Sequence, residues 1–140
     1  MNKRIIICCD GTSNSALAKD TIPTNIQRIS ELLLPTGSDG KMQTIYYHPG
    51  VGTPTTDSDE GSYYDQAIGK SLDLHVKELY KFLVDNYCEG DEIYCFGFSR
   101  GAFTVRTLLG LIKHFGILKK DGYGETTSST GKILKSYYDA

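Results

Sequence analysis

DEIYCFGFSRGAF, residues 91–103, is the stretch that decides the fold of this chain. Its first half is a short apolar run typical of a strand, and the residues after Ser99 predict a helix. Gly97 and Gly101 flank Ser99 in a G-x-S-x-G pattern, which is typical of a nucleophile elbow, a sharp strand-to-helix turn that exposes a serine hydroxyl. Small residues are needed there because strand and helix approach closely around a strained serine. The pattern predicts Ser99 as a nucleophile; the competing interpretation is an ordinary strand-to-helix turn.

Upstream of this stretch, strands and helices alternate. RIIICC (residues 4–9) is a continuous apolar run typical of a strand buried on both faces, and MQTIYY (residues 42–47) predicts another strand. A helix is predicted between them, because Thr24 and Gln27 form a capping-box pattern and Pro35 ends the helical pattern. A second helix is predicted over residues 64–87. This alternation predicts an α/β fold, a parallel sheet with flanking helices in three layers.

Each predicted helix has apolar residues at helical spacing, which we expect to face the sheet. The expected packing positions are Ile26, Ile29, Leu32 and Leu33 in the first helix, Ile68, Leu72, Val76, Leu79, Leu83 and Tyr87 in the second, and Ala102, Val105, Leu108, Leu109 and Ile112 in the third.

Composition excludes several classes of function. The chain has 140 residues, of which 39% are hydrophobic and 23% charged, as in a globular domain. Its net charge is −2 and no basic stripe is present, so nucleic acid is not an expected partner. No apolar run approaches the roughly 18 residues of a membrane span, and the apolar run near the N-terminus is too short for a signal peptide. We therefore expect a cytoplasmic protein.

The four cysteines are expected to be reduced core residues. Three of them, Cys8, Cys9 and Cys95, lie in predicted strands, and the fourth is Cys88. Adjacent strand residues point to opposite faces of a sheet, so Cys8 and Cys9 should separate. There is no Cys-x-x-Cys for zinc, and we expect no disulfide framework, metal or cofactor.

Several motifs together resemble a known family. In chain order they are CDGT (residues 9–12), PTNI (23–26), YYHPGVGT (46–53), GDEI (90–93) and FGFSRGAFTVR (96–106), with GLI (110–112) following in register. They resemble the DUF2235 domain, the catalytic domain of Tle1-like type VI secretion phospholipase effectors. The resemblance covers nearly the whole chain. It implies a partial α/β-hydrolase fold, Ser99 as nucleophile, and hydrolysis of small-molecule or lipid esters, phospholipids among them.

The resemblance also implies a second part of the site. In such hydrolases one oxyanion amide comes from the loop after an early strand, and another from the residue after the nucleophile. Carried over, the donors are the amides of Gly11 or Thr12 and of Arg100; the competing interpretation of the early loop is a plain polar turn. Further pocket candidates are Asp10, His48, Gly50 and Gly52, although the two glycines equally suit a turn.

The expected acid and base of a catalytic triad are missing. In α/β-hydrolases an Asp or Glu and then a His follow the serine. The only histidine after Ser99 is His114, which lies fifteen residues further along the same predicted helix, roughly 20 Å away, and is too far to be the base. His75 is expected on a helix surface. Residues 1–140 thus read as the N-terminal portion of one hydrolase-like domain, truncated after the elbow.

Two functions remain open. The first is a serine hydrolase of acyl esters, and the second is a catalytically incomplete remnant that acts as a binding or interaction module. A sheet of three or four strands exposes an apolar edge, which predicts self-association. Two other patterns fail: an aspartyl phosphatase loop would need an aspartate where Cys8 stands, and a phosphate-binding P-loop would need a glycine where Tyr64 stands.

Overall fold

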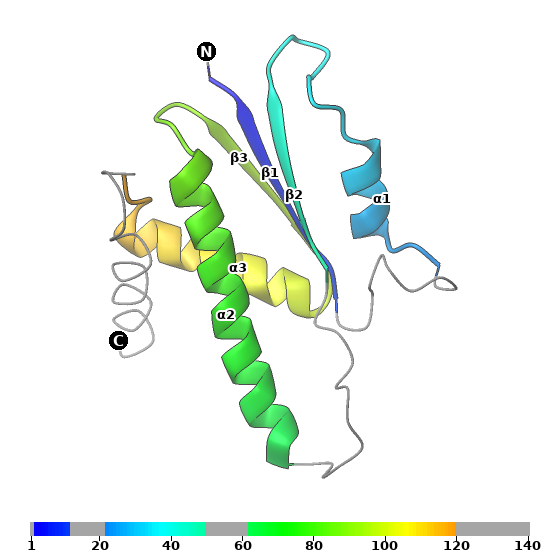
Figure 1. Ribbon diagram of the computed structural model, residues 1–140, viewed down its shortest axis with the longest axis vertical. Coiled ribbons are helices and arrows are strands. Elements are labelled where there is room, and N and C mark those ends of the chain that lie inside the picture. The colour runs from blue at the N-terminus through cyan, green and yellow to red at the C-terminus, as the bar shows by residue number, and fades with distance from the viewer. Residues whose placement is uncertain (1, 12–21, 50–61, 120–140) are drawn as a thin grey trace.

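The chain forms a three-stranded parallel sheet with helices on both faces. The computed structural model describes residues 2–11, 22–49 and 62–119, with side chains of the long helix described from residue 72. The elements are β1 (Arg4–Cys9), α1 (Asn25–Leu32), β2 (Gln43–His48), α2 (Ser62–Asn86), β3 (Glu92–Gly97) and α3 (Arg100–Phe115), arranged as in Figure 1. The predicted α/β class, parallel sheet and flanking helices are confirmed.

The strand order is β2-β1-β3, so the first strand of the chain is the central one. Both pairings are parallel, and Cys9 at the end of β1 lies opposite His48 of β2 and Gly97 of β3. The carboxyl ends of all three strands therefore meet at one edge of the sheet. This is the edge at which open α/β sheets place their ligand sites.

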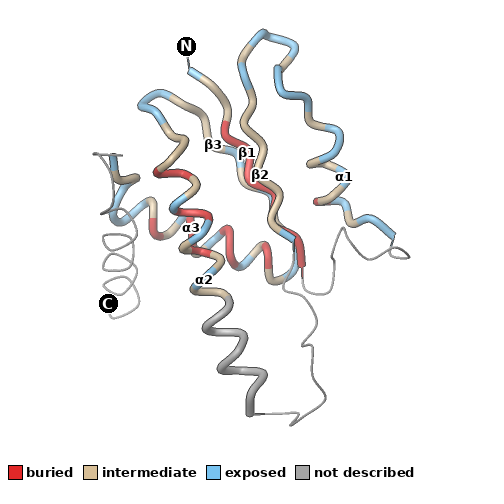
Figure 2. The backbone as a smooth tube through the Cα atoms, in the orientation of Figure 1, coloured by how far each residue is buried: buried red, intermediate tan, exposed pale blue. Residues whose placement is uncertain are grey.

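Each face of β1 contributes to a separate apolar cluster. Ile5, Ile7 and Cys9 are buried against α2 and α3, in the cluster that contains Leu79, Tyr80 and Leu108. Ile6 and Cys8 point the other way, toward Ile26 of α1. Figure 2 shows the buried residues concentrated in β1 and along α2 and α3. The prediction that Cys8 and Cys9 face opposite sides is confirmed.

Two of the predicted packing positions are wrong. Leu32 is 79% exposed and Leu109 is 45% exposed, whereas Tyr80 and Leu111 are fully buried although they were not expected. At about 100° per residue, Leu32 lies about 60° around the helix from Ile29 but about 100° from Leu33 and about 120° from Ile26, beyond one side of the buried row. In α3 the buried face runs through Gly101, Thr104, Val105, Leu108 and Leu111, which leaves Leu109 outside it.

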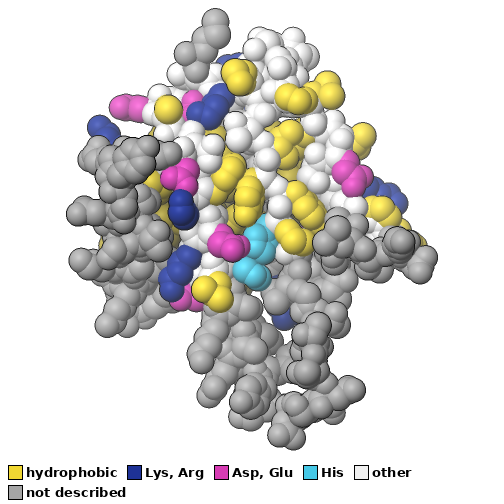
Figure 3. Space-filling model, viewed as in Figure 1, with side chains coloured by type: hydrophobic (Ala, Val, Ile, Leu, Met, Phe, Trp, Pro, Cys, Tyr) yellow, Lys and Arg dark blue, Asp and Glu magenta, His cyan; other side chains and the backbone are white. Residues whose placement is uncertain are grey.

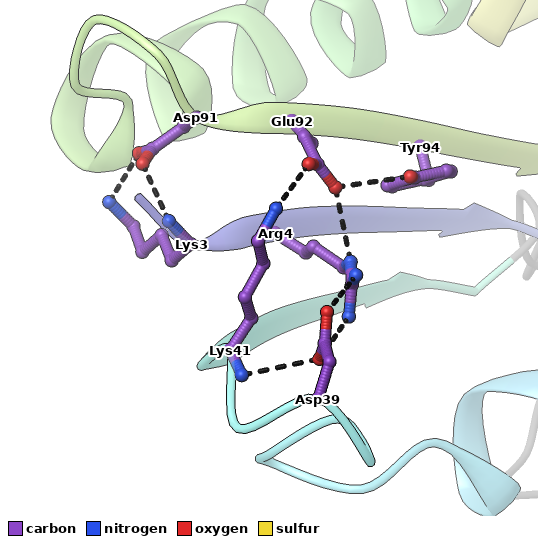
Figure 4. Close-up of polar contacts among 7 residues, drawn as sticks. All are labelled: Lys3, Arg4, Asp39, Lys41, Asp91, Glu92 and Tyr94. Atoms are coloured by element: carbon purple, nitrogen blue, oxygen red, sulfur yellow. Dashed lines mark hydrogen bonds and ion pairs between the residues drawn. The ribbon is translucent and has the colours of Figure 1, made fainter. Parts of the chain in front are cut away.

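The amino ends of the strands are joined by ion pairs at the edge opposite the strand ends described above (Figure 4). Lys3 contacts Asp91 at 2.6 Å, and Arg4 contacts both Asp39 at 2.6 Å and Glu92 at 3.1 Å. The Asp91 side chain is only 2% exposed and also accepts the backbone N–H groups of Lys3 and of Cys88. These contacts hold the strand starts in register, far from the edge where Ser99 lies.

Candidate functional site

Ser99 stands between β3 and α3 in a strained backbone conformation. Its φ is 52° and its ψ is −122°, and it is the only non-glycine residue with positive φ in the part of the chain that the structure describes. Such a conformation costs about 1–3 kcal/mol and persists only where the surroundings hold it. Here the Phe98 N–H donates to the Cys9 carbonyl, and the Ser99 carbonyl accepts the Ala102 N–H. The turn therefore presents Ser99, which is exposed, at the carboxyl edge of the sheet.

The two glycines around Ser99 lie where a Cβ atom has no room. A Cβ on Gly97 would lie 2.6 Å from the Ala102 Cα, and one on Gly101 would lie 2.3 Å from the Cys9 carbonyl oxygen. All the nearest obstacles are backbone atoms, so no side chain can turn aside to make space. The start of α3 is thus packed directly on the ends of β1 and β3, and this contact sets the position of Ser99.

The N-terminus of α3 faces the Ser99 side of the turn. Among the described residues, no acceptor takes the N–H of Arg100, the first residue of α3. The free N–H groups and the dipole at a helix N-terminus favour negative charge there. The Arg100 amide is therefore unengaged in the described part of the chain, and its role as an oxyanion donor stays a prediction.

Gly11, two residues after the end of β1, lies against Ser99. A Cβ on Gly11 would lie 3.1 Å from the Ser99 Cβ and 3.1 Å from the Phe98 ring. The N–H of Gly11, however, donates to the Asp10 carboxylate at 2.8 Å, so this amide is already engaged. Thr12, the alternative donor, lies outside the described residues. Gly11 itself therefore does not offer a free amide in this structure, and the oxyanion role of this loop stays a prediction.

Asp10 is the most buried polar residue at this edge. It is 3% exposed, and its carboxylate also accepts the Thr24 hydroxyl at 2.5 Å and the Tyr47 hydroxyl at 2.9 Å. Burial raises the pKa of the Tyr47 phenol above its ordinary range, and the hydrogen bond to the Asp10 carboxylate raises it further. The pocket candidate Asp10 thus holds side chains together. Sequence reasoning missed Tyr47; its only signal was a place in the motif that includes His48.

His48 lies at the end of β2 and engages α2. Its Nε2 lies 3.2 Å from a Glu78 carboxylate oxygen, and its ring centroid lies 4.3 Å from that of His75. Figure 3 shows histidine side chains beside an acidic one on this face of the molecule. Burial lowers the pKa of His75, and the neighbouring His48 lowers it further, against the opposing effect of Glu78. His48 is joined to Asp10 only through its backbone, because its carbonyl accepts the Asp10 N–H at 3.0 Å.

No base reaches Ser99 within the described ranges. None of the hydrogen bonds among these residues joins the Ser99 hydroxyl to a histidine or a carboxylate. His114 lies near the far end of α3. Over the same residues, no group of three His, Cys, Asp or Glu side chains could hold a metal ion, and no helix is long and apolar enough to cross a membrane. Gly50 and Gly52, the remaining pocket candidates, lie outside the described residues.

Comparison with known proteins gives one family and one curated relative. The family model described as "T6SS, Phospholipase effector Tle1-like, catalytic domain" matches residues 3–139. An uncharacterized protein of Saccharomyces cerevisiae, YEL023C, is 35% identical over 150 aligned residues. The match covers 99% of this chain but 21% of the relative, so the chain spans about a fifth of that protein's length. No solved structure matches the chain significantly.

Proposed function

Because the chain belongs to the family of Tle1-like phospholipase effector catalytic domains of type VI secretion, we propose that it forms the nucleophile-bearing part of a serine hydrolase of acyl esters. The family description points to phospholipids as the substrate class. The observation that carries the proposal is the backbone of Ser99, held at positive φ between a strand end and a helix N-terminus. A nucleophile elbow requires a strained, exposed serine at this position.

In the proposed reaction the Ser99 oxygen attacks the ester carbonyl carbon. A histidine base takes the hydroxyl proton as the bond forms, and the carbonyl oxygen becomes an oxyanion. The amide of Arg100 stabilises that charge, together with an amide of the loop after β1, for which Thr12 is the candidate. Collapse of the intermediate expels the alcohol, which takes the proton from the histidine. Water then hydrolyses the acyl-serine by the same steps.

We propose that the base and its orienting acid come from outside residues 1–140. Two observations support this: no base reaches Ser99 within the described ranges, and the curated relative has about four-fifths of its length beyond the matched part. The chain would then be the N-terminal portion of one hydrolase domain. Its cytoplasmic location stays a prediction of the sequence.

A second function, an interaction module, is favoured by one feature of β3. In the described part of the chain β3 pairs only with β1, and α1 packs against β1 and β2. The aromatic residues of β3 and the following turn are therefore open: Tyr94 is 45%, Phe96 37% and Phe98 53% exposed. An apolar edge strand of this kind pairs readily with another strand, so it would support self-association or docking of a partner.

Labelling with a fluorophosphonate probe distinguishes the two functions. The hydrolase proposal expects labelling of the chain together with the segment that supplies the base, and it expects Ser99→Ala to abolish that labelling. Ser30→Ala is the matched control, because Ser30 lies on α1 and bonds only the Gln27 carbonyl. Labelling that survives Ser99→Ala would contradict the nucleophile assignment. A folded protein that is not labelled, but self-associates in sedimentation analysis until Phe96→Glu disrupts the association, would favour the interaction module.

A further inference from the structure

We propose that Asp10 is a positioning residue for Ser99: its carboxylate gathers donors from three segments and so holds the loop after β1 against the turn that carries the serine. The inference rests on the proposed function. Asp10 would be an additional residue of the proposed hydrolase site, one that does not touch the substrate and acts through Gly11.

Three donors surround the Asp10 carboxylate. Oδ1 accepts the Gly11 N–H at 2.8 Å, while Oδ2 accepts the Thr24 hydroxyl at 2.5 Å and the Tyr47 hydroxyl at 2.9 Å. These donors come from the loop after β1, the N-cap of α1 and the body of β2. One buried carboxylate therefore fixes three segments that are distant in sequence.

Burial makes the hydrogen bonds of the Asp10 carboxylate necessary. A carboxylate that is 3% exposed is costly unless its oxygens are hydrogen-bonded, so a buried acid without a partner would not persist here. Hydrogen bonds to an ionised acceptor are shorter and stronger than those between neutral groups. The arrangement thus favours one geometry of the loop, because any rotation of Asp10 would break several bonds at once.

Backbone packing connects Asp10 to Ser99. The Asp10 carbonyl oxygen lies 2.5 Å from where a Cβ on Gly101 would stand, so its backbone is packed on the first turn of α3. A Cβ on the next residue, Gly11, would lie 3.1 Å from the Ser99 Cβ, so Gly11 borders the Ser99 side chain. A shift of Asp10 therefore moves both the wall beside Ser99 and the helix that supports it.

The negative charge of Asp10 is surrounded by hydrogen-bond donors. A carboxylate near a developing oxyanion would oppose it, unless donors already satisfy that carboxylate. The contacts of Asp10 do this, and one of them engages the Gly11 amide. We therefore expect the loop's oxyanion donor to be an amide after Gly11.

The test compares Asp10→Asn with Asp91→Asn, a matched control. Asp91 is a similarly buried carboxylate with donors from Lys3 and Cys88, but it lies at the opposite edge of the sheet. In Asp10→Asn we expect the rate of fluorophosphonate labelling at Ser99 to fall about 10- to 100-fold, as small misplacements of reacting groups do. In Asp91→Asn the labelling rate should equal that of the wild type. Thr24→Ser, which keeps the hydroxyl, should label normally, whereas Thr24→Val should be slowed.

Amide NMR shifts provide a readout that does not depend on catalysis. Asp10→Asn should move the Ser99, Arg100 and Gly101 cross-peaks, and Asp91→Asn should not. Wild-type labelling at Ser99 with unmoved cross-peaks in Asp10→Asn would overturn the inference. If the wild type is not labelled even with the segment that supplies the base present, the proposed function fails, while the cross-peaks still decide the positioning role. If Asp10→Asn does not fold, the same readouts are taken on Tyr47→Phe, which removes one donor, and unchanged values there reject the proposal.

Discussion

Replacing Gly101 by alanine tests how closely α3 is packed on the central strand. The new Cβ would lie 2.3 Å from the Cys9 carbonyl oxygen and 2.5 Å from that of Asp10, whereas real Cβ contacts stay above 3.0 Å. The start of α3 must therefore move away from β1 by at least about 0.7 Å, because β1 is held between β2 and β3. Overpacking typically costs about 1–3 kcal/mol, and better helix propensity returns about 1 kcal/mol at most. We expect a net loss of about 1 kcal/mol.

Urea unfolding followed by circular dichroism measures this loss. At a typical slope of about 1–3 kcal/mol per molar, the midpoint for Gly101→Ala should fall by about 0.5 M. Gly40→Ala is the control: Gly40 has φ +80° and no atom within 4 Å of its added Cβ. It should cost only the strain of the left-handed conformation, about 1–2 kcal/mol, and leave probe labelling at Ser99 unchanged. A Gly101→Ala protein as stable as the wild type would refute the argument for direct backbone packing at the turn.

Two further predictions concern groups away from Ser99. Although burial opposes it, the contacts with Lys3 hold the pKa of Asp91 below its ordinary value, so the stabilisation of the fold by Asp91 should be complete above about pH 4 and lost as the pH falls further. In Asp91→Asn the loss of unfolding free energy in acid should be smaller than in the wild type. An unchanged pH profile of stability would contradict this. Burial raises the pKa of Cys95 to about 11 and of Cys9 to about 12, so native protein at pH 8 should react quickly with a thiol reagent only at the exposed Cys88. Cys88→Ser should remove this fast phase of the reaction. A second rapidly reacting thiol would show that the core opens.

Local chemistry in the sequence was enough to predict the main elements. The Ile-rich run of β1 predicted a strand buried on both faces, and the structure confirms it. Half of the capping box at Thr24 is confirmed, because the Thr24 hydroxyl accepts the Gln27 N–H at 3.1 Å, whereas the Gln27 side chain donates to Glu31. Such features depend on neighbours within four residues, so a sequence carries them directly. The G-x-S-x-G spacing belongs to the same class, since strand, turn and helix are contiguous.

Contacts between distant segments were decided only by the tertiary structure. Tyr47 and Thr24 meet at the Asp10 carboxylate because β1 is the central strand and the strand ends coincide, which no local pattern states. The same packing buries Tyr80, whose hydroxyl donates to the Gly116 carbonyl, and leaves Leu109 exposed. Sequence periodicity identifies the apolar residues of a helix, but which of them are buried depends on the surfaces that the fold brings against it.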